Sequence, residues 1–193
     1  MASLRLVPCL LLTLVSGGAA AQGTIPPKEQ QITAAVLPLP TELRASARVL
    51  GYGADGKLVT LREGKGMVCL ASDPKRDEFH VACYHESMEP FMARGRALRA
   101  SGVKGELVDS ARFREVKAGT LKMPAGAAML YSQTGGKFDA STGTAPGAKA
   151  LYVTYLPFAT ATTTGLSEKP VVGGPWIMFP GTPKAHIMYV PSM

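Results

Sequence analysis

The sequence predicts an α+β fold, in which a mainly antiparallel sheet begins with a β-meander and two helices are inserted mid-chain. Three observations predict this fold class. Short runs rich in Val and Leu alternate with turn residues, and two longer segments have helical periodicity. The 21 Gly and 15 Pro among 193 residues favour many turns over long helices. The length suits a single domain, because domains cluster at roughly 100–150 residues.

The β-meander is the clearest of these signals. It consists of three Val- and Leu-rich runs at residues 47–52, 57–62 and 66–71. The first two runs flank Asp55-Gly56, a pair typical of hairpin turns because Gly takes a positive φ without steric cost. The segment therefore predicts consecutive antiparallel strands joined by short turns.

A fourth strand is expected at residues 79–84, after a charged turn. Successive side chains of a strand point to opposite faces of the sheet. The expected faces are Phe79, Val81 and Cys83 on one side, and His80, Ala82 and Tyr84 on the other. If the third and fourth strands pair as a hairpin, Cys69 can lie opposite Cys83.

Helices are expected before and after these four strands. A short helix at 29–36 and one further helical turn at 41–44 precede them. After them, Ser87 can cap a helix that ends before Gly102, and a second helix is expected at 106–117. The remaining strands are expected at 127–132, 150–156, 176–179 and 185–190.

The first 21 residues have the pattern of a secretory signal peptide. Arg5 precedes an apolar stretch at residues 6–15, which is too short to span a bilayer. Small residues at Ala19 and Ala21 then fit an A-x-A-like cleavage site. The sequence therefore predicts a cleaved signal peptide at 1–21 and an exported protein.

Cleavage after Ala21 would leave a lead-in with a short helix at 22–44 and a single α+β domain at 45–193. Two cysteines, Cys69 and Cys83, remain in this chain. A cysteine pair in an exported protein most often forms a disulfide, because that compartment is oxidising. The predicted localisation is therefore periplasmic or secreted, with a Cys69–Cys83 disulfide.

The charge balance bears on the partners. Lys and Arg number 21 against 14 Asp and Glu, a formal net charge of +7. Nucleic acid is not an expected partner of an exported protein, and no apolar run is long enough for a transmembrane helix. The expected partner is a small ligand or an anionic component of the cell envelope. The simpler interpretation of the basic residues at 94–117 is a solvated helix face.

Catalytic signatures are absent from the sequence. It has no G-x-S-x-G, S-x-x-K, P-loop or G-x-G-x-x-G motif, and we expect no cofactor. Histidine is the usual acid–base group at neutral pH. The candidates for acid–base catalysis are therefore His186, on the last expected strand, and His85 with Glu86 or Glu89.

A second chemical possibility is a soft metal ion, since His80, Cys83 and His85 form H-x2-C-x-H. Imidazole and thiolate ligands suit Cu(I) or Zn(II). A strand, however, places His80 and Cys83 on opposite faces, and a disulfide would remove the thiolate. The favoured interpretation is a disulfide flanked by two surface histidines.

Six segments carry a resemblance to a known family. They are residues 49–52 (V-L-G-Y), 55–64 (D-G-K-L-V-T-L-R-E-G), 67–74 (M-V-C-L-A-S-D-P), 82–84 (A-C-Y), 88–93 (M-E-P-F-M-A) and 175–188 (from P-W-I-M-F-P-G-T-P to H-I-M). In these segments the chain resembles a family of exported bacterial proteins with no assigned function. The resemblance implies export, paired cysteines and a single domain, and it assigns no catalytic residue.

The sequence thus favours an exported soluble protein that acts as a non-catalytic binding or envelope-associated module. One alternative is an enzyme that uses His186, or His85 with a carboxylate, as its acid–base groups. The other alternative is a protein that binds a soft metal ion such as copper or zinc.

Overall fold

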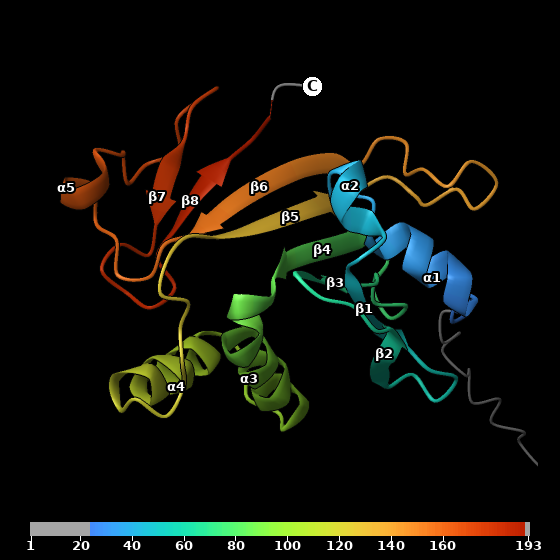
Figure 1. Cartoon of the computed structure of the whole chain (residues 1–193), viewed down its shortest axis with the longest axis horizontal. Coiled ribbons are helices and arrows are strands. Elements are labelled where there is room, and N and C mark those ends of the chain that lie inside the picture. The colour runs from blue at the N-terminus through green and yellow to red at the C-terminus, as the bar shows by residue number, and fades with distance from the viewer. Residues whose placement is uncertain (1–23, 192–193) are drawn as a thin grey trace, which may run out of the picture.

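A computed structural model describes residues 24–191, so the predicted signal peptide at 1–21 lies outside the described residues. It contains an eight-stranded sheet in the order β2-β1-β3-β4-β5-β6-β8-β7 (Figure 1). The strands are β1 (Arg48–Tyr52), β2 (Leu58–Arg62), β3 (Met67–Leu70), β4 (His80–His85), β5 (Ala128–Thr134), β6 (Lys149–Tyr155), β7 (Trp176–Met178) and β8 (His186–Tyr189). Neighbouring strands are antiparallel except β1 and β3, which confirms the predicted α+β class with a mainly antiparallel sheet.

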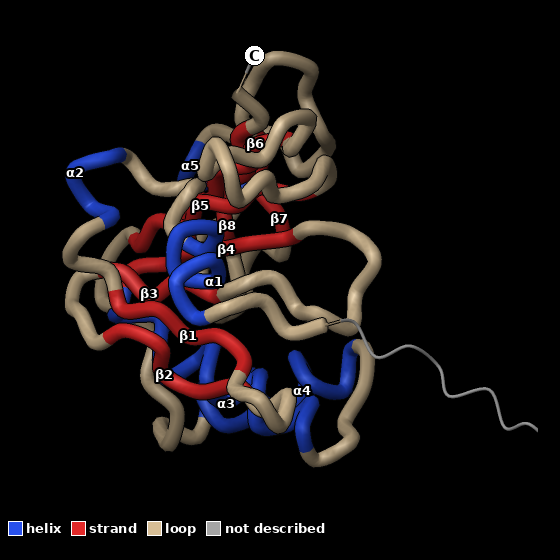
Figure 2. The backbone as a smooth tube through the Cα atoms, turned by 90° about the vertical axis from the view of Figure 1, so that its right-hand side faces the viewer, coloured by secondary structure: helices blue, strands red, loops and turns tan. Residues whose placement is uncertain are grey.

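The helices lie in three separate places, with the last helix by itself near β7 (Figure 1). They are α1 (Lys28–Ala35), α2 (Thr41–Arg44), a 3-10 turn η1 (Glu86–Met88), α3 (Glu89–Ala100), α4 (Glu106–Lys117) and α5 (Ala161–Thr164). α3 and α4 lie beside each other, away from α1 and α2 (Figures 1 and 2). Within residues 24–191, no helix is long and apolar enough to cross a membrane.

The predicted β-meander is wrong at its third strand. β1 and β2 form the expected hairpin, with Gly56 at a φ of 72°. β3 then pairs with β1, in parallel, and not with β2. The reason is burial, because β1 and β3 are largely buried while the first three residues of β2 are exposed. Placing β2 at the edge keeps the two apolar strands inside the sheet.

The connection from β2 to β3 depends on a close backbone approach. Lys65 donates its backbone N–H to the carbonyl oxygen of Ser46, at 2.8 Å. A Cβ atom on Gly64 would lie only 2.3 Å from the same oxygen. Glycine is therefore required where the chain passes the start of β1.

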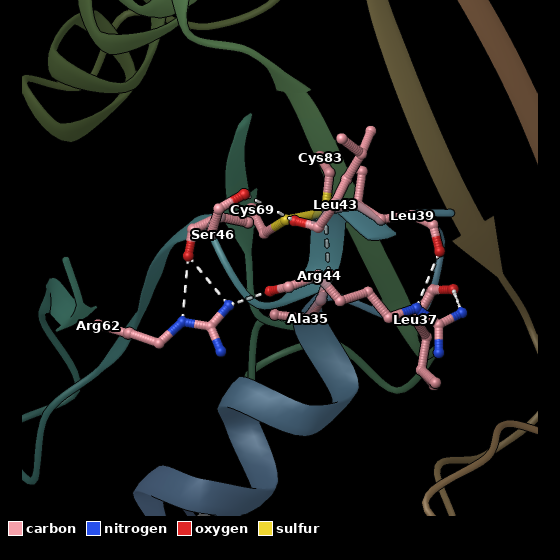
Figure 3. Close-up of a disulfide and its surroundings, with 10 residues drawn as sticks. Ala35, Leu37, Leu39, Leu43, Arg44, Ser46, Arg62, Cys69 and Cys83 are labelled. Carbon is pink, nitrogen blue, oxygen red and sulfur yellow. Dashed lines mark hydrogen bonds between the residues drawn. A yellow bond between two sulfur atoms is a disulfide. The ribbon is translucent and has the colours of Figure 1, made fainter. Parts of the chain in front are cut away.

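One face of the sheet is closed by α1 and the segment that follows it. Here Ala35 and Leu39 pack with Val49, Cys69 and Cys83, all at most 1 % exposed. Residues before 45 thus share a core with the strands. Two arginines stabilise the turns on this face by donating hydrogen bonds to backbone carbonyl oxygens (Figure 3). Arg44 donates to Leu37 and Leu39. Arg62 donates to Arg44 and Ala47.

The Cys69–Cys83 disulfide, predicted from the sequence, lies within this core (Figure 3). The two residues are direct partners across β3 and β4, with Cα atoms 3.9 Å apart. The Sγ atom of Cys83 also contacts the carbonyl oxygen of Ala35, at 3.1 Å. The disulfide therefore joins β3 and β4 directly beneath α1.

The opposite face of the sheet is covered by α3 and α4. Tyr84 on β4 packs with Met88 and Phe91, and with Val153 and Tyr155 on β6. His85, and not the predicted Ser87, caps the turn before α3, since its side chain accepts from the backbone N–H of Ser87. α4 has the predicted bounds.

Candidate functional site

His186 lies buried at the start of β8, with 6 % of its surface exposed. Its Nδ1 atom is 2.7 Å from the carbonyl oxygen of Lys184 and donates to it, because a carbonyl can only accept. The ring packs against Tyr155 and Phe179, with centroids 5.1 and 5.7 Å away. This burial lowers the pKa of His186, so the neutral imidazole is favoured.

The other acid–base candidates lie elsewhere. His85 is exposed and has its Nδ1 atom 2.8 Å from the hydroxyl of Ser87. Glu86 accepts from the backbone N–H of Gly66 at 2.7 Å. Glu89 accepts from Arg96 on the face of the sheet that α3 covers, which we call the α3 face.

Strand register shows how far apart the two histidines lie. Tyr84, Leu130, Val153 and Met188 are successive partners across β4, β5, β6 and β8. Alternation therefore places His186 on the face of Tyr84, with two strands between β8 and β4, and places His85 on the opposite face. The structure does not bring His85 and His186 together, and catalysis by either stays a prediction.

The proposed soft-metal ligands His80 and Cys83 also lie on opposite faces of the sheet. His80 has its Nδ1 atom 2.8 Å from the hydroxyl of Thr134, and Cys83 is bonded to Cys69 on the other face of β4. In the described part of the chain, no group of three or more His, Cys, Asp or Glu side chains could hold a metal ion.

The α3 face instead contains an open groove between the sheet and α3, which we name the basic groove. Its outer lobe has a cavity volume of about 810 Å³. Leu70 on β3 and Ala82 on β4 contribute to its floor, and the C-terminal half of α3 forms one wall. The cationic residues on its lining are Lys75, Arg76, Arg96 and Arg99.

The inner lobe continues the groove beneath α3, with a cavity volume of about 330 Å³. Leu70, Ala82, Arg96 and Arg99 line both lobes and so mark their junction. The deeper lining adds the apolar or aromatic residues Phe91, Met92, Leu130 and Tyr155 and the cations Arg112 and Lys184. The two cavities thus adjoin along shared walls, and we treat them together as the basic groove.

A polar cluster at the junction fixes Arg96. Its guanidinium donates to the Tyr84 hydroxyl at 2.6 Å and to Glu89 at 2.7 Å, and Tyr84 donates in turn to Glu89. Burial and this carboxylate raise the pKa of Tyr84 well above its ordinary value, so its hydroxyl keeps its proton. The charge of Arg96 is therefore compensated within the protein.

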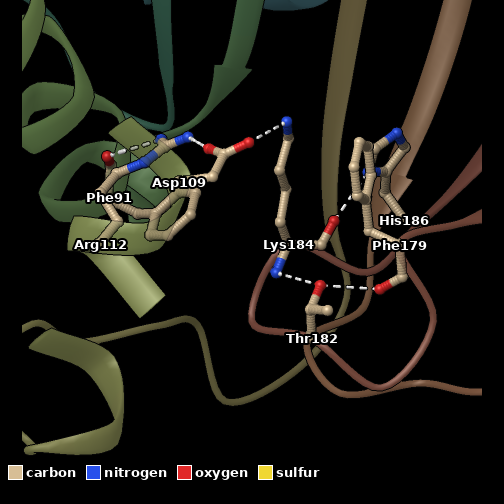
Figure 4. A network of polar contacts seen from close by, with 7 residues as sticks. All are labelled: Phe91, Asp109, Arg112, Phe179, Thr182, Lys184 and His186. Atoms are coloured by element: carbon tan, nitrogen blue, oxygen red, sulfur yellow. Dashed lines mark hydrogen bonds and ion pairs between the residues drawn. The ribbon is translucent and has the colours of Figure 1, made fainter. Parts of the chain in front are cut away.

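A second polar network closes the inner lobe (Figure 4). Asp109 on α4 forms ion pairs with Arg112 and with Lys184, whose Nζ lies 2.9 Å away. Arg112 is 3 % exposed, donates to the carbonyl of Phe91 and stacks over its ring. Burial alone would raise the pKa of Asp109, but the hydrogen bonds and charges of Lys184 and Arg112 outweigh it and lower that pKa.

The outer lobe differs because three of its four cations are not compensated. Within residues 24–191, Lys75, Arg76 and Arg99 form no ion pair. Asp73 is the one acid among the described lining residues, and it accepts from the backbone N–H of Lys75 at 2.9 Å. The outer lobe therefore carries a net positive charge above an apolar floor, which attracts anions.

Most of these residues were missed as a site by sequence reasoning. The arginines of α3 were expected to form a solvated helix face, and residues 73–77 were expected to form only a charged turn. A usable signal was the face of β4 that carries Ala82, where a small side chain between larger ones leaves room over the sheet. Comparison of the chain with protein-family models, curated proteins and solved structures finds no match.

Proposed function

We propose that this chain is an exported, non-catalytic ligand-binding protein, periplasmic or secreted, which binds a small organic anion in the basic groove. The observation that carries the proposal is the set of uncompensated cations, Lys75, Arg76 and Arg99, above an apolar floor. The Cys69–Cys83 disulfide supports export, because such bonds persist in oxidising compartments. The resemblance to exported bacterial proteins points the same way.

The lining supports an organic anion better than an inorganic one. Leu70, Ala82, Ala97 and Ala100 provide apolar surface beside the cations. Burying apolar ligand surface contributes roughly 25 cal/mol per Å², while the cations supply orientation and charge-assisted hydrogen bonds. The outer lobe is also within the size range of sites for small molecules, about 300–1,000 Å³.

A fluorescent anion tests the proposal directly. 8-Anilinonaphthalene-1-sulfonate combines an aromatic body with a sulfonate, and N-phenyl-1-naphthylamine is its uncharged counterpart. We expect the purified protein to bind the sulfonate at one site, with an affinity that falls as salt is added, and to bind the uncharged probe much more weakly. Fluorescence titration at several salt concentrations measures both.

A matched pair of arginine variants locates the binding. Arg99→Gln removes an uncompensated cation of the groove, and Arg114→Gln removes an exposed arginine of α4 outside its lining. Loss of a charge-assisted hydrogen bond should weaken sulfonate binding about tenfold in Arg99→Gln only. Equal affinities in both variants, or no binding by the wild type, would refute the proposed site.

A further inference from the structure

We infer that the ligand of the basic groove is a single-chain amphiphile, with a phosphate or carboxylate head in the outer lobe and an alkyl chain that runs into the inner lobe. This inference rests on the proposed function and adds the class of ligand and its orientation. Two observations support it: the ion pairing of the cations in each lobe and the apolar side chains that the inner lobe adds beyond the junction.

The charge difference fixes where the head would bind. In the inner lobe, Arg112 and Lys184 share the carboxylate of Asp109, so these cations are already partnered. Lys75 and Arg76 from the β3–β4 turn line the outer lobe alone, Arg99 from α3 lies at the junction of the two lobes, and none of the three has an acidic partner among the described residues. An anionic head would therefore gain most by binding in the outer lobe.

The lining fixes where the chain would run. From the outer lobe, the floor passes Leu70 and Ala82, which line both lobes. Beyond this junction the inner lobe is lined by Phe91, Met92 and Leu130, and flexible Met side chains adapt well to alkyl groups. A chain of methylenes fits this path, whereas a second anionic group would have to compete with Asp109, whose single carboxylate already pairs with Arg112 and Lys184.

An alkyl phosphate series tests the inference on the unchanged protein. The probes are inorganic phosphate, hexyl, octyl and decyl phosphate below their micelle concentrations, and decanol. Each methylene that enters the inner lobe should strengthen binding by up to roughly fourfold, the equivalent of about 0.8 kcal/mol. Isothermal titration should therefore rank decyl above octyl above hexyl phosphate, with inorganic phosphate and decanol far weaker.

Two variants separate head from chain. Arg76→Gln should weaken all three alkyl phosphates by the same factor, because it changes only the head site. Ala82→Leu should narrow the junction and flatten the dependence on chain length, while hexyl phosphate loses least. Because the series is measured first on the wild type, it decides the inference even if Ala82→Leu does not fold, which circular dichroism would show.

The outcomes distinguish this inference from the proposed function. If all alkyl phosphates bind as weakly as inorganic phosphate, yet the naphthalene sulfonate still binds at the groove, the amphiphile is excluded and the proposed function stands. If neither kind of anion binds, both fail. Binding to phosphatidylglycerol vesicles but not to monomeric decyl phosphate would also overturn the inference, since it would indicate a membrane surface as the partner.

Discussion

The two faces of the sheet are closed in different ways. On one face, α1 approaches β1 and β4 closely, and its small residue Ala35 is fully buried against the disulfide. On the other face, α3 packs mainly against α4, where Gly95 leaves space for the guanidinium of Arg112. A Cβ atom on Gly95 would lie 2.9 Å from that guanidinium.

This difference explains why one face of the sheet is closely packed while the other contains a groove. Small apolar side chains let a helix lie directly on the strands, which seals the α1 face. Large charged side chains on α3 and α4 bond to one another and leave a groove between α3 and the strands. Substitutions on the sealed face should therefore change stability, and substitutions on the outer lobe should change binding.

The largest expected effect on stability is at Arg112, a residue of the groove face that is structural. Arg112→Met removes a buried cation and leaves the carboxylate of Asp109 with Lys184 alone. Loss of this ion pair, of the hydrogen bond to the Phe91 carbonyl and of the stacking on its ring should together lower the free energy of unfolding by about 4 kcal/mol. Urea denaturation measures it, with the exposed Arg114→Met as the control, expected within about 0.5 kcal/mol of wild type.

Removing the disulfide tests whether the α1 face contributes to stability and not to binding. The double variant Cys69→Ala, Cys83→Ala removes a cross-link between residues 14 positions apart. Its loss should lower the free energy of unfolding by about 3 kcal/mol, since the unfolded chain gains the entropy of an open loop. Where the variant is still folded, its affinity for the naphthalene sulfonate should equal that of wild type. A large loss of affinity would show that the two faces are not independent.

Substitutions in the outer lobe should lower the anion affinity and leave the stability unchanged. The double variant Arg76→Gln, Arg99→Gln removes two uncompensated cations, neither of which forms an ion pair with a described residue. We expect its free energy of unfolding to stay within about 0.5 kcal/mol of wild type. Its anion affinity should fall more than tenfold and depend less steeply on salt. A destabilised variant with unchanged affinity would contradict the division between the faces.

The smallest expected effect concerns His186 and pH. Burial, aided by the charge of nearby Lys184, lowers the pKa of His186 in the folded chain. The unfolded chain therefore binds the proton more readily, and stability falls as the pH drops through about 6.5, the unfolded value. His80 is half-buried, and desolvation lowers its pKa too, so it contributes with the same sign.

Denaturation curves from pH 7.5 to 5.5 test this dependence. His186→Gln should flatten the fall in stability only in part, because His80 remains. The exposed Arg114→Gln, which removes no histidine, serves as the control and should leave the slope unchanged. A slope that is the same in wild type and His186→Gln would remove His186 from the account.

Local sequence patterns predicted the elements, but not all of their partners. Hairpin and helix signals act over a few residues, which is why the β1–β2 hairpin, α4 and the Cys69–Cys83 pairing were predicted correctly. The parallel partner of β3 depends on which strands can be buried together, and this is a property of the whole sheet.

The basic groove was hidden from the sequence for the same reason. Arg99 on α3 has the pattern of a solvated helix residue, and Arg76 lies in a turn more than 20 positions earlier. Only the position of α3 relative to the sheet and the β3–β4 turn brings both to one groove with Ala82. Alternation on β4 predicted that His80, Ala82 and Tyr84 share a face, but neither a groove on that face nor the elements that would lie over it.

The most direct test of the account is a map of ligand contacts on the two faces. Amide chemical shifts of the isotopically labelled protein would be followed by nuclear magnetic resonance during titration with decyl phosphate. We expect the largest changes at the groove, at Leu70, Ala82 and Arg99, and little change at Ala35 and Leu39 beneath α1. Changes centred on α1, or spread evenly over both faces, would contradict the assignment of binding to the α3 face.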